Sequence, residues 1–154
     1  MRAVVQRINH GSVAVEGETV GAAGAGLFIL LGVAEGDTKE DAELLAGKIS
    51  RLRIFCDEQG KMNLSALDIK GDFLVVSNFT LMANYRHGNR PDFLGAAPPA
   101  EAEALYEYFL SLLRAIPGLG SVGAGRFGAH MEISVCLDGP VTIVMESDTL
   151  KKKK

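Results

Sequence analysis

The apolar positions of the chain alternate or cluster in short runs that predict several strands and two helices. Strands are expected at residues 3–8, 12–15, 27–33, 53–56, 72–81, 131–137 and 143–145. The run 27–33 is apolar on both faces, which is typical of a strand in the middle of a sheet. Because strands outnumber helices and no strand–helix unit repeats, the pattern predicts an α+β domain. We expect a mainly antiparallel, curved or barrel-like sheet with two helices packed outside it.

The two predicted helices have clear start signals. Thr38 is a candidate N-cap for the first helix. Glu40 and Asp41 fall in its first turn, where negative charge interacts favourably with the helix dipole. The second helix is expected to open at Pro98-Pro99 and to end before Pro117-Gly118. The apolar stripes are Leu45, Ile49 and Leu52 on the first helix and Leu105, Phe109, Leu112, Leu113 and Ile116 on the second.

Length and composition indicate one globular domain. The chain has 154 residues, 47% of them hydrophobic and 23% charged. We assign residues 1–150 to the domain and expect the basic tail 151–154 to be disordered and solvated. No run approaches the roughly 18 apolar residues of a membrane helix, so no membrane association is predicted. Cys56 and Cys136 lack a CxxC spacing and are expected to be buried, reduced thiols, which suits the cytoplasm.

The charge balance limits the kinds of partner. The formal net charge is −3, and without the four terminal lysines it is −7, from twelve basic and nineteen acidic residues. Such a chain does not grip nucleic acid with its whole surface, so any nucleic-acid contact must be local.

Several familiar chemistries are absent from the sequence. The glycines at 21–26 precede a strand and lack a Gly-Lys-Ser/Thr, which argues against a nucleotide-binding loop. His10, His87 and His130 are isolated, so neither a metal nor another cofactor is predicted. Ser77 does not belong to a G-x-S-x-G elbow.

Two segments break local rules. Residues 77–81 end a buried strand abruptly with polar side chains, and residues 138–142 contain Gly139-Pro140 between two strand-like flanks. The locally favoured interpretation of the second segment is a hairpin turn at Asp138-Gly139. Pro140 fits that interpretation poorly, because it cannot donate to a strand ladder and its peptide bond with Gly139 can adopt the cis form at modest cost. The pair can present backbone carbonyls in a rigid direction.

A long irregular segment, residues 83–99, separates the strand ending near residue 81 from the second helix. Loops of this length in compact domains are usually functional or mobile. Its local charge is positive through Arg86 and Arg90.

Together the two rule-breaking segments resemble the signatures of the D-aminoacyl-tRNA deacylase family, a Ser-Gln-Phe-Thr-Leu strand end and an Asn-x-Gly-Pro-Val-Thr turn. The resemblance covers nearly the whole chain, through the opening Val-Gln-Arg and the segments 24–27, 31–33, 53–55, 60–64, 90–93 and 104–106. Two positions depart from it. Asn78 stands where the family usually has Gln, and Leu137 stands where the second signature begins with Asn.

The resemblance implies a homodimer that hydrolyses the ester joining a D-amino acid, or glycine, to the 3′ end of tRNA. In the family the Gly-Pro bond is cis, and the pair from one subunit enters the active site of the other. The implied catalytic residues are Ser77, Phe79 and Thr80; the implied substrate-binding residues are Asn78, Met131, Gly139 and Pro140; Arg7 and Leu137 would support the site.

The chemistry of an aminoacyl ester fits this assignment. The ester is already activated, so oriented water and stabilisation of an oxyanion suffice. We expect backbone N–H groups near Phe79-Thr80 to bind the oxyanion and a ribose hydroxyl of the substrate to assist proton transfer. A carbonyl ledge at Gly139-Pro140 would reject L side chains. The basic side chains that could contact tRNA phosphates are those of Arg86 and Arg90 in the long loop, with Lys48 or Arg51 on the first helix.

Other readings stay open. Thr80 could act as a covalent nucleophile, although no base is evident in the sequence. The chain could be a non-catalytic module that binds an RNA end or a small ligand. It could also be a Ser/His esterase of free small esters, which would depend on His87.

Overall fold

The computed structural model describes residues 1–151, with β1 (Arg2–Val15) at its centre. One edge of β1 pairs antiparallel with β3 (Gly26–Gly32) and, further along, with β2 (Glu18–Ala23). The other edge pairs antiparallel with β8 (Glu132–Glu146). Beyond β3, the strands β6 (Asp72–Ser77) and β7 (Val122–Ala124) continue the sheet in parallel. The sheet is therefore mixed but mainly antiparallel.

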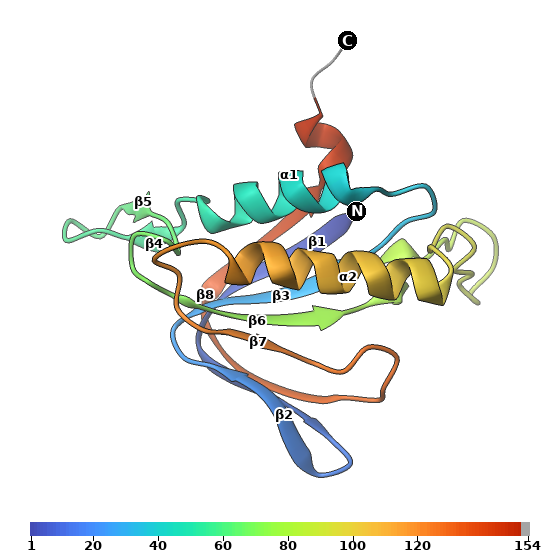
Figure 1. Ribbon diagram of the computed structural model, residues 1–154, viewed down its shortest axis with the longest axis horizontal. Coiled ribbons are helices and arrows are strands. Elements are labelled where there is room, and N and C mark those ends of the chain that lie inside the picture. Colours follow the sequence, from blue (N-terminus) through green and yellow to red (C-terminus); the bar gives the residue numbers. More distant parts are fainter. Residues whose placement is uncertain (152–154) are drawn as a thin grey trace.

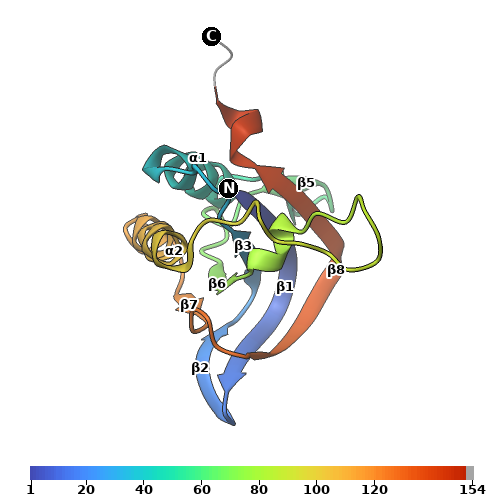
Figure 2. The ribbon, with the colours of Figure 1, turned by 90° about the vertical axis from the view of Figure 1, so that its right-hand side faces the viewer.

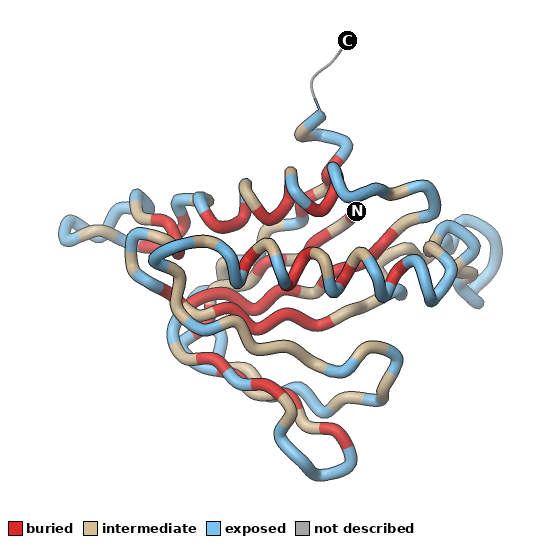
Figure 3. The backbone as a smooth tube through the Cα atoms, viewed as in Figure 1, coloured by how far each residue is buried: buried red, intermediate tan, exposed pale blue. Residues whose placement is uncertain are grey.

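Two helices cover one face of this sheet, as expected for an α+β fold. Figure 1 shows α1 (Lys39–Ser50) and α2 (Pro99–Arg114) side by side above the strands, and Figure 2 shows both on the same side of the curved sheet. The buried faces of the helices point toward the sheet in Figure 3. Thr38 is the N-cap of α1, as predicted, and its backbone N–H donates to the Asp41 carboxylate at 2.9 Å. The second helix starts at the predicted proline pair.

Strand β6 is apolar on both faces because each face packs into a different hydrophobic cluster. Phe73 and Val75 pack into the main core under the helices, whereas Leu74 and Val76 enter a smaller cluster on the opposite face. The smaller cluster also contains Ile8, Val13, Ala23 and Phe28. A curved sheet that wraps around this second cluster gains apolar burial on both sides.

The curvature brings the two ends of the sheet, β2 and β7, almost together. A Cβ atom on Gly21 would lie 2.2 Å from the carbonyl oxygen of Ala124, and one on Gly123 would lie 2.5 Å from that of Ala22. Only glycine permits this backbone approach. The result is a nearly closed barrel, which confirms the predicted shape.

Shorter elements complete the chain. A small hairpin consists of β4 (Phe55–Cys56) and β5 (Met62–Leu64). The 3₁₀ helices are η1 (Phe79–Met82) and η2 (Ser147–Leu150). Three boundary predictions were wrong: β1 is one strand rather than two, the strand predicted at 72–81 ends at Ser77, and the glycine-rich segment 120–125, for which no strand was predicted, contains β7.

The hairpin predicted at Asp138-Gly139 is also wrong. Both flanks belong to β8 and pair with β1 in one direction, since Leu137 faces Ile8 and Thr142 faces Gln6. Residues 138–141 therefore bulge out of a continuous strand opposite the single residue Arg7. The bulge accommodates Pro140, which has no N–H for the ladder.

Both cysteines were predicted to be buried, and both are exposed, reduced thiols. Cys56 lies in the small surface hairpin, and Cys136 lies on β8, where most side chains face outward. The apolar sequence context was misleading because, within the described chain, nothing packs on the outer faces of these strands.

The C-terminal segment returns to the start of α1. The Lys151 ammonium lies 2.8 Å from both the buried Asp41 carboxylate and the exposed Asp148 carboxylate. The first residue of the predicted tail is thus held by ion pairs, whereas residues 152–154 lie outside the described part of the chain. Within residues 1–151, no helix has both the length and the apolar character to cross a membrane.

Candidate active site

A cavity of about 980 Å³ opens where β6 ends and η1 begins. Its wall includes Ser77, Asn78, Phe79, Thr80 and Met131, five of the residues predicted for the site. The sequence reasoning missed further lining residues, namely Glu35, Phe93, Phe127 and His130. These come from three separate loops, and only their position beside strand or helix ends could have indicated them.

Asn78 fixes the geometry of Thr80. The Asn78 N–H donates to the Leu31 carbonyl at 2.8 Å, which anchors the residue to the end of β3. Its side-chain oxygen accepts hydrogen bonds from both the backbone N–H of Thr80 at 3.2 Å and the Thr80 hydroxyl at 2.5 Å. This is the local side-chain-to-backbone turn that Asn favours. The Thr80 hydroxyl proton therefore points to Asn78, and the oxygen lone pairs are left for a ligand.

The two backbone donors considered for an oxyanion differ in this arrangement. The Thr80 N–H is engaged by Asn78. The Phe79 N–H has no acceptor among residues 1–151. An oxyanion at this point would consequently find one free backbone donor rather than two.

Phe79 links the site to the long loop that follows it. Its ring is 59% exposed and packs edge-on against Phe93, with ring centroids 5.1 Å apart and planes at 79°. Such edge-to-face pairs are favourable beyond simple burial. The segment 77–80 is thus held by the hydrogen bond from Asn78 to Leu31 and by the packing of Phe79 on Phe93.

Tyr106 forms the floor of the cavity from α2. Its hydroxyl donates to the Val75 carbonyl at 2.9 Å, and burial raises the pKa of Tyr106 to about 12. The phenol stays protonated at neutral pH and serves as a structural donor. Tyr108, on the same helix, is only half-buried.

The three histidines occupy different environments. His130 lines the cavity, His87 lies on an exposed loop outside it, and His10 is exposed on β1. This placement removes the main residue of the esterase hypothesis from the site. Among the described residues no three His, Cys, Asp or Glu side chains gather in a way that could hold a metal ion.

The remaining predicted residues meet at the β8 bulge. The Gly139–Pro140 peptide bond is cis, and both residues are exposed. The Arg7 Nε donates to the Asp138 carbonyl at 3.1 Å and lies 3.1 Å from its carboxylate, while an Nη atom donates to the Ile54 carbonyl at 2.8 Å. The Arg7 side chain is only 11% exposed. It holds the base of the bulge from the opposite strand.

The bulge does not reach the cavity of its own chain. Neither Gly139 nor Pro140 lines that cavity. Ile133 does, but about 20 Å of extended strand separates it from Gly139. The structure thus brings together two groups of predicted residues, at two separate places.

The β8 surface around the bulge is unusually apolar for an exposed strand. Ile133, Leu137 and Val144 are 39%, 45% and 63% exposed. The outer edge of β8 pairs with no strand within residues 1–151. A long, apolar, unpaired edge normally has a partner.

Comparisons with known proteins identify the family. The model of the family described as D-Tyr-tRNA(Tyr) deacylase matches residues 4–146. A D-aminoacyl-tRNA deacylase of Dehalococcoides mccartyi is 56% identical over 147 residues, covering 96% of this chain and 95% of the relative. One of Thermotoga petrophila is 55% identical over 150 residues, covering 97% and 99%.

Solved structures give the same picture of the fold. The c-Myc DNA Unwinding Element Binding Protein superposes with a TM-score of 0.85 at 41% identity, covering 95% of this chain and 98% of that one. A probable eukaryotic D-amino acid tRNA deacylase superposes with a TM-score of 0.81 at 17% identity, covering 94% and 98%, which supports the fold alone. From the whole-length family match and the relatives above 50% identity, the chain belongs to the D-Tyr-tRNA(Tyr) deacylase family.

Proposed function

We propose that the protein hydrolyses the ester bond between a D-amino acid and the 3′-terminal ribose of tRNA, releasing the free D-amino acid and tRNA. Family membership and the names of the close relatives support this reaction. The observation that carries it in this chain is the cavity beside residues 77–80, with a backbone N–H and an oriented threonine hydroxyl at its wall.

The reaction needs little from the protein because the ester is activated. Water attacks the ester carbonyl, the Phe79 N–H stabilises the oxyanion, and the ribose oxygen leaves with the proton that the water gives up. A neighbouring ribose hydroxyl of the substrate assists that proton transfer. Thr80 accepts a hydrogen bond from water or from the substrate, and Ser77 and Met131 shape the wall on either side. No covalent intermediate on Thr80 is required, since its hydroxyl already donates to Asn78.

Chirality is enforced in this proposal by a second subunit. The exposed bulge of one chain enters the cavity of its partner, and the Gly139-Pro140 backbone lies against the α-carbon of the amino acid. A hydrogen atom or a D side chain fits, whereas an L side chain meets backbone that cannot rotate away. Glycine passes this filter, so glycyl-tRNA is also a substrate.

Two features of the chain support the homodimer. The site residues of a single chain fall into two separate groups, and the apolar edge of β8 around the bulge is exposed. A symmetric pairing in which each chain supplies a cavity and a bulge satisfies both features, because a two-fold interface uses the same surface twice. Arg7 and Leu137 then act as supports of the bulge. We also propose a cytoplasmic location, where aminoacyl-tRNA is used.

A binding module is the second candidate, motivated by the departures at Asn78 and Leu137. The discriminating experiment incubates the protein with D-Tyr-tRNA and with L-Tyr-tRNA and follows release of tyrosine. Selective loss of the D ester is the expected result. Binding of both without turnover would instead support the module.

A further inference from the structure

The long loop after η1 contains a closed, basic segment, residues 85–91, which we call the basic loop. Its base is fixed by two backbone hydrogen bonds between Asn84 and Asp92, at 2.8 and 2.9 Å. The Asn84 side-chain amide also donates to the Asp92 carboxylate at 3.0 Å. These bonds hold the two ends of the loop together, so its tip is presented from a defined base rather than from a loose connection.

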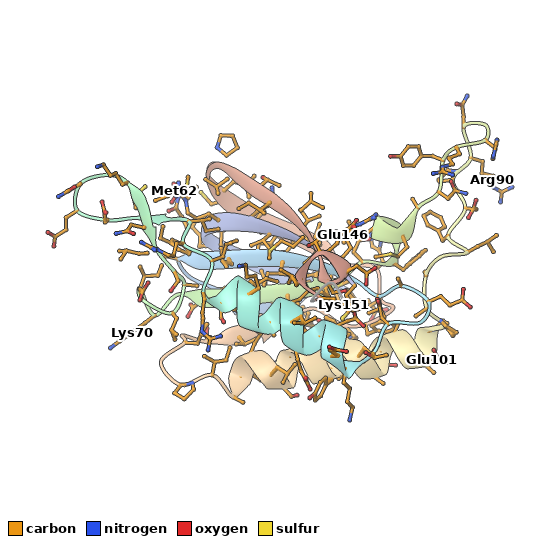
Figure 4. All side chains as sticks on the ribbon, turned by 90° about the horizontal axis from the view of Figure 1, so that it is seen from above. Met62, Lys70, Arg90, Glu101, Glu146 and Lys151 are labelled. Atoms are coloured by element: carbon orange, nitrogen blue, oxygen red, sulfur yellow. The ribbon has the colours of Figure 1, made fainter. Side chains whose placement is uncertain are left out.

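The basic loop concentrates positive charge in an otherwise acidic protein. Residues 85–91 include Arg86, His87 and Arg90 and no carboxylate, whereas the whole chain has a net charge of −3. All three side chains are exposed, and neither arginine takes part in an ion pair with another described residue. Figure 4 shows Arg90 projecting away from the body of the molecule. Exposed arginines are usually only solvated, so a role in binding depends on where the basic loop lies relative to the cavity.

The position of the basic loop is tied to the candidate active site. Phe93, just after the loop, packs on Phe79 and lines the cavity. Tyr85 and Arg86, at its beginning, line a second hollow of about 500 Å³ that shares Thr80 with the first. The loop therefore lies beside the cavity: its first two residues line the adjoining hollow, and Phe93, two residues beyond its end, lines the cavity itself. The RNA strand must leave from that point, and each of its internucleotide linkages carries one negative charge.

We propose that the basic loop contacts phosphodiesters of the RNA strand that carries the aminoacyl ester, through Arg86 and Arg90. The guanidinium group suits phosphate because it offers several donors in a planar fork. The other basic side chains considered from the sequence, Lys48 and Arg51, lie on or at the end of α1 and line neither hollow. This inference rests on the proposed function for the identity of the ester, and it concerns affinity rather than chemistry.

The test compares the wild-type protein with the double variant Arg86→Gln/Arg90→Gln on two substrates. One is D-Tyr-tRNA, and the other is D-tyrosyl-adenosine, which has the ester but no phosphodiester. Losing two phosphate contacts on a single strand should reduce the slope of log KM against log salt for the tRNA by about 1.4. Between 50 and 200 mM salt, the wild-type KM should then rise about sevenfold more than that of the variant. The kcat on either substrate and the KM for D-tyrosyl-adenosine should not change.

A matched control removes two positive charges elsewhere. Lys61→Gln/Lys70→Gln changes the net charge equally. In Figure 4, Lys70 and Met62, the residue that follows Lys61, lie at the opposite end of the molecule from Arg90. This control should keep the wild-type salt slope. An equal effect in the control, an unchanged slope in the arginine variant, or a matching loss on D-tyrosyl-adenosine would overturn the proposal.

Failure of the proposed function can be told apart from failure of this inference. If the wild-type protein hydrolyses neither ester, the reaction is wrong. Binding of uncharged tRNA by the wild-type and variant proteins then still measures the two salt slopes, and equal slopes would overturn the role of the basic loop.

Discussion

Asn78 and Thr80 form the most closely defined contact at the mouth of the cavity. One side-chain oxygen accepts both donors of Thr80, so the threonine hydroxyl has one orientation. A Gln side chain, usual in the family, is one methylene longer and is less suited to this short turn. The departure at Asn78 therefore changes how the hydroxyl is held while an amide remains at the same place.

Asn78→Ala should release the Thr80 hydroxyl without unfolding the protein. Because a neutral hydrogen bond contributes about 1 kcal/mol, we expect kcat on D-Tyr-tRNA to fall roughly fivefold to tenfold, with KM little changed. The kcat of Asn78→Gln should lie between those of the wild-type protein and Asn78→Ala. The matched control is Asn63→Ala on the distant strand β5, which should behave as wild type. An unchanged kcat in Asn78→Ala would show that the orientation of Thr80 has no part in the rate.

Gly139→Ala should disturb the bulge from within its own chain. An added Cβ would lie 2.2 Å from the Val141 nitrogen, so the backbone must shift. A misplacement near 1 Å at a reacting centre can cost about 100-fold in rate, and we expect a loss of that order on D-Tyr-tRNA with weaker discrimination against L-Tyr-tRNA. Gly47→Ala in α1 is the control, because its Cβ would meet nothing nearer than 3.8 Å. Unchanged rates on both enantiomers would rule out the filter.

At the scale of elements, the pairing of β1 with β8 positions the bulge that we propose as the chiral filter. Arg7 on β1 bonds to Asp138 on the bulge and to Ile54 ahead of β4, which joins three segments through one guanidinium group. Since the side chain is nearly buried, its bonds are protected from solvent, and charge-assisted hydrogen bonds of this kind are stronger than neutral ones.

Arg7→Lys should keep the charge but lose the planar fork that reaches both partners. We expect the free energy of unfolding to fall by about 2 kcal/mol and the discrimination between D-Tyr-tRNA and L-Tyr-tRNA to weaken. Chemical denaturation and the two deacylation rates measure these effects. Arg53→Lys is a control near the same hairpin, because the Arg53 side chain is exposed there and donates to a single carbonyl. A stable Arg7→Lys protein with full discrimination would show that the bulge needs no support from Arg7.

Periodicity and end signals were enough to predict both helices and the central strands from the sequence. Thr38 and the Pro98-Pro99 pair are local signals, and local signals determine helix starts. The bulge at Gly139-Pro140 could not be derived in this way, because its flanks pair with the distant strand β1 rather than with each other. The resemblance to the family supplied residues 77–80 as a site. The contributions of His130 and Phe127 to the cavity depend on how loops meet, which no local pattern encodes.

For the whole molecule, a buried polar cluster joins the two ends of the fold. Asp41 is 1% exposed and accepts hydrogen bonds from Ser147 at 2.7 Å and from Lys151 at 2.8 Å. Burial raises the pKa of the Asp41 carboxyl, but the hydrogen bonds from Lys151, Ser147 and the Thr38 backbone outweigh burial and hold that pKa well below its usual range. A lowered pKa means that the ionised carboxylate stabilises the fold.

This contribution depends on pH in a definite direction. It is fully present above the usual carboxyl pKa of about 4 and is lost as the pH falls toward the lower value of the folded state. We expect Asp41→Asn to reduce the free energy of unfolding by about 2 kcal/mol at pH 7, and the difference from wild type to shrink between pH 4 and pH 2. Asp148→Asn, which changes the exposed partner of Lys151, should cost less than about 1 kcal/mol. Equal losses at pH 7 and pH 2 would contradict the role of the Asp41 charge.

The central claim is that the cavity of one chain is completed by the bulge of another, and mixed dimers test it most directly. Thr80→Val impairs the cavity and Gly139→Ala impairs the bulge, so each variant alone should be slow on D-Tyr-tRNA. If the bulge acts in trans, a dimer of one subunit of each kind contains one site in which both parts are intact. Unfolding the two variants together and refolding them as a mixture should therefore restore D-Tyr-tRNA hydrolysis well above either variant refolded alone. Activity no higher than the average of the separate variants, in a mixture shown to contain mixed dimers, would contradict the account.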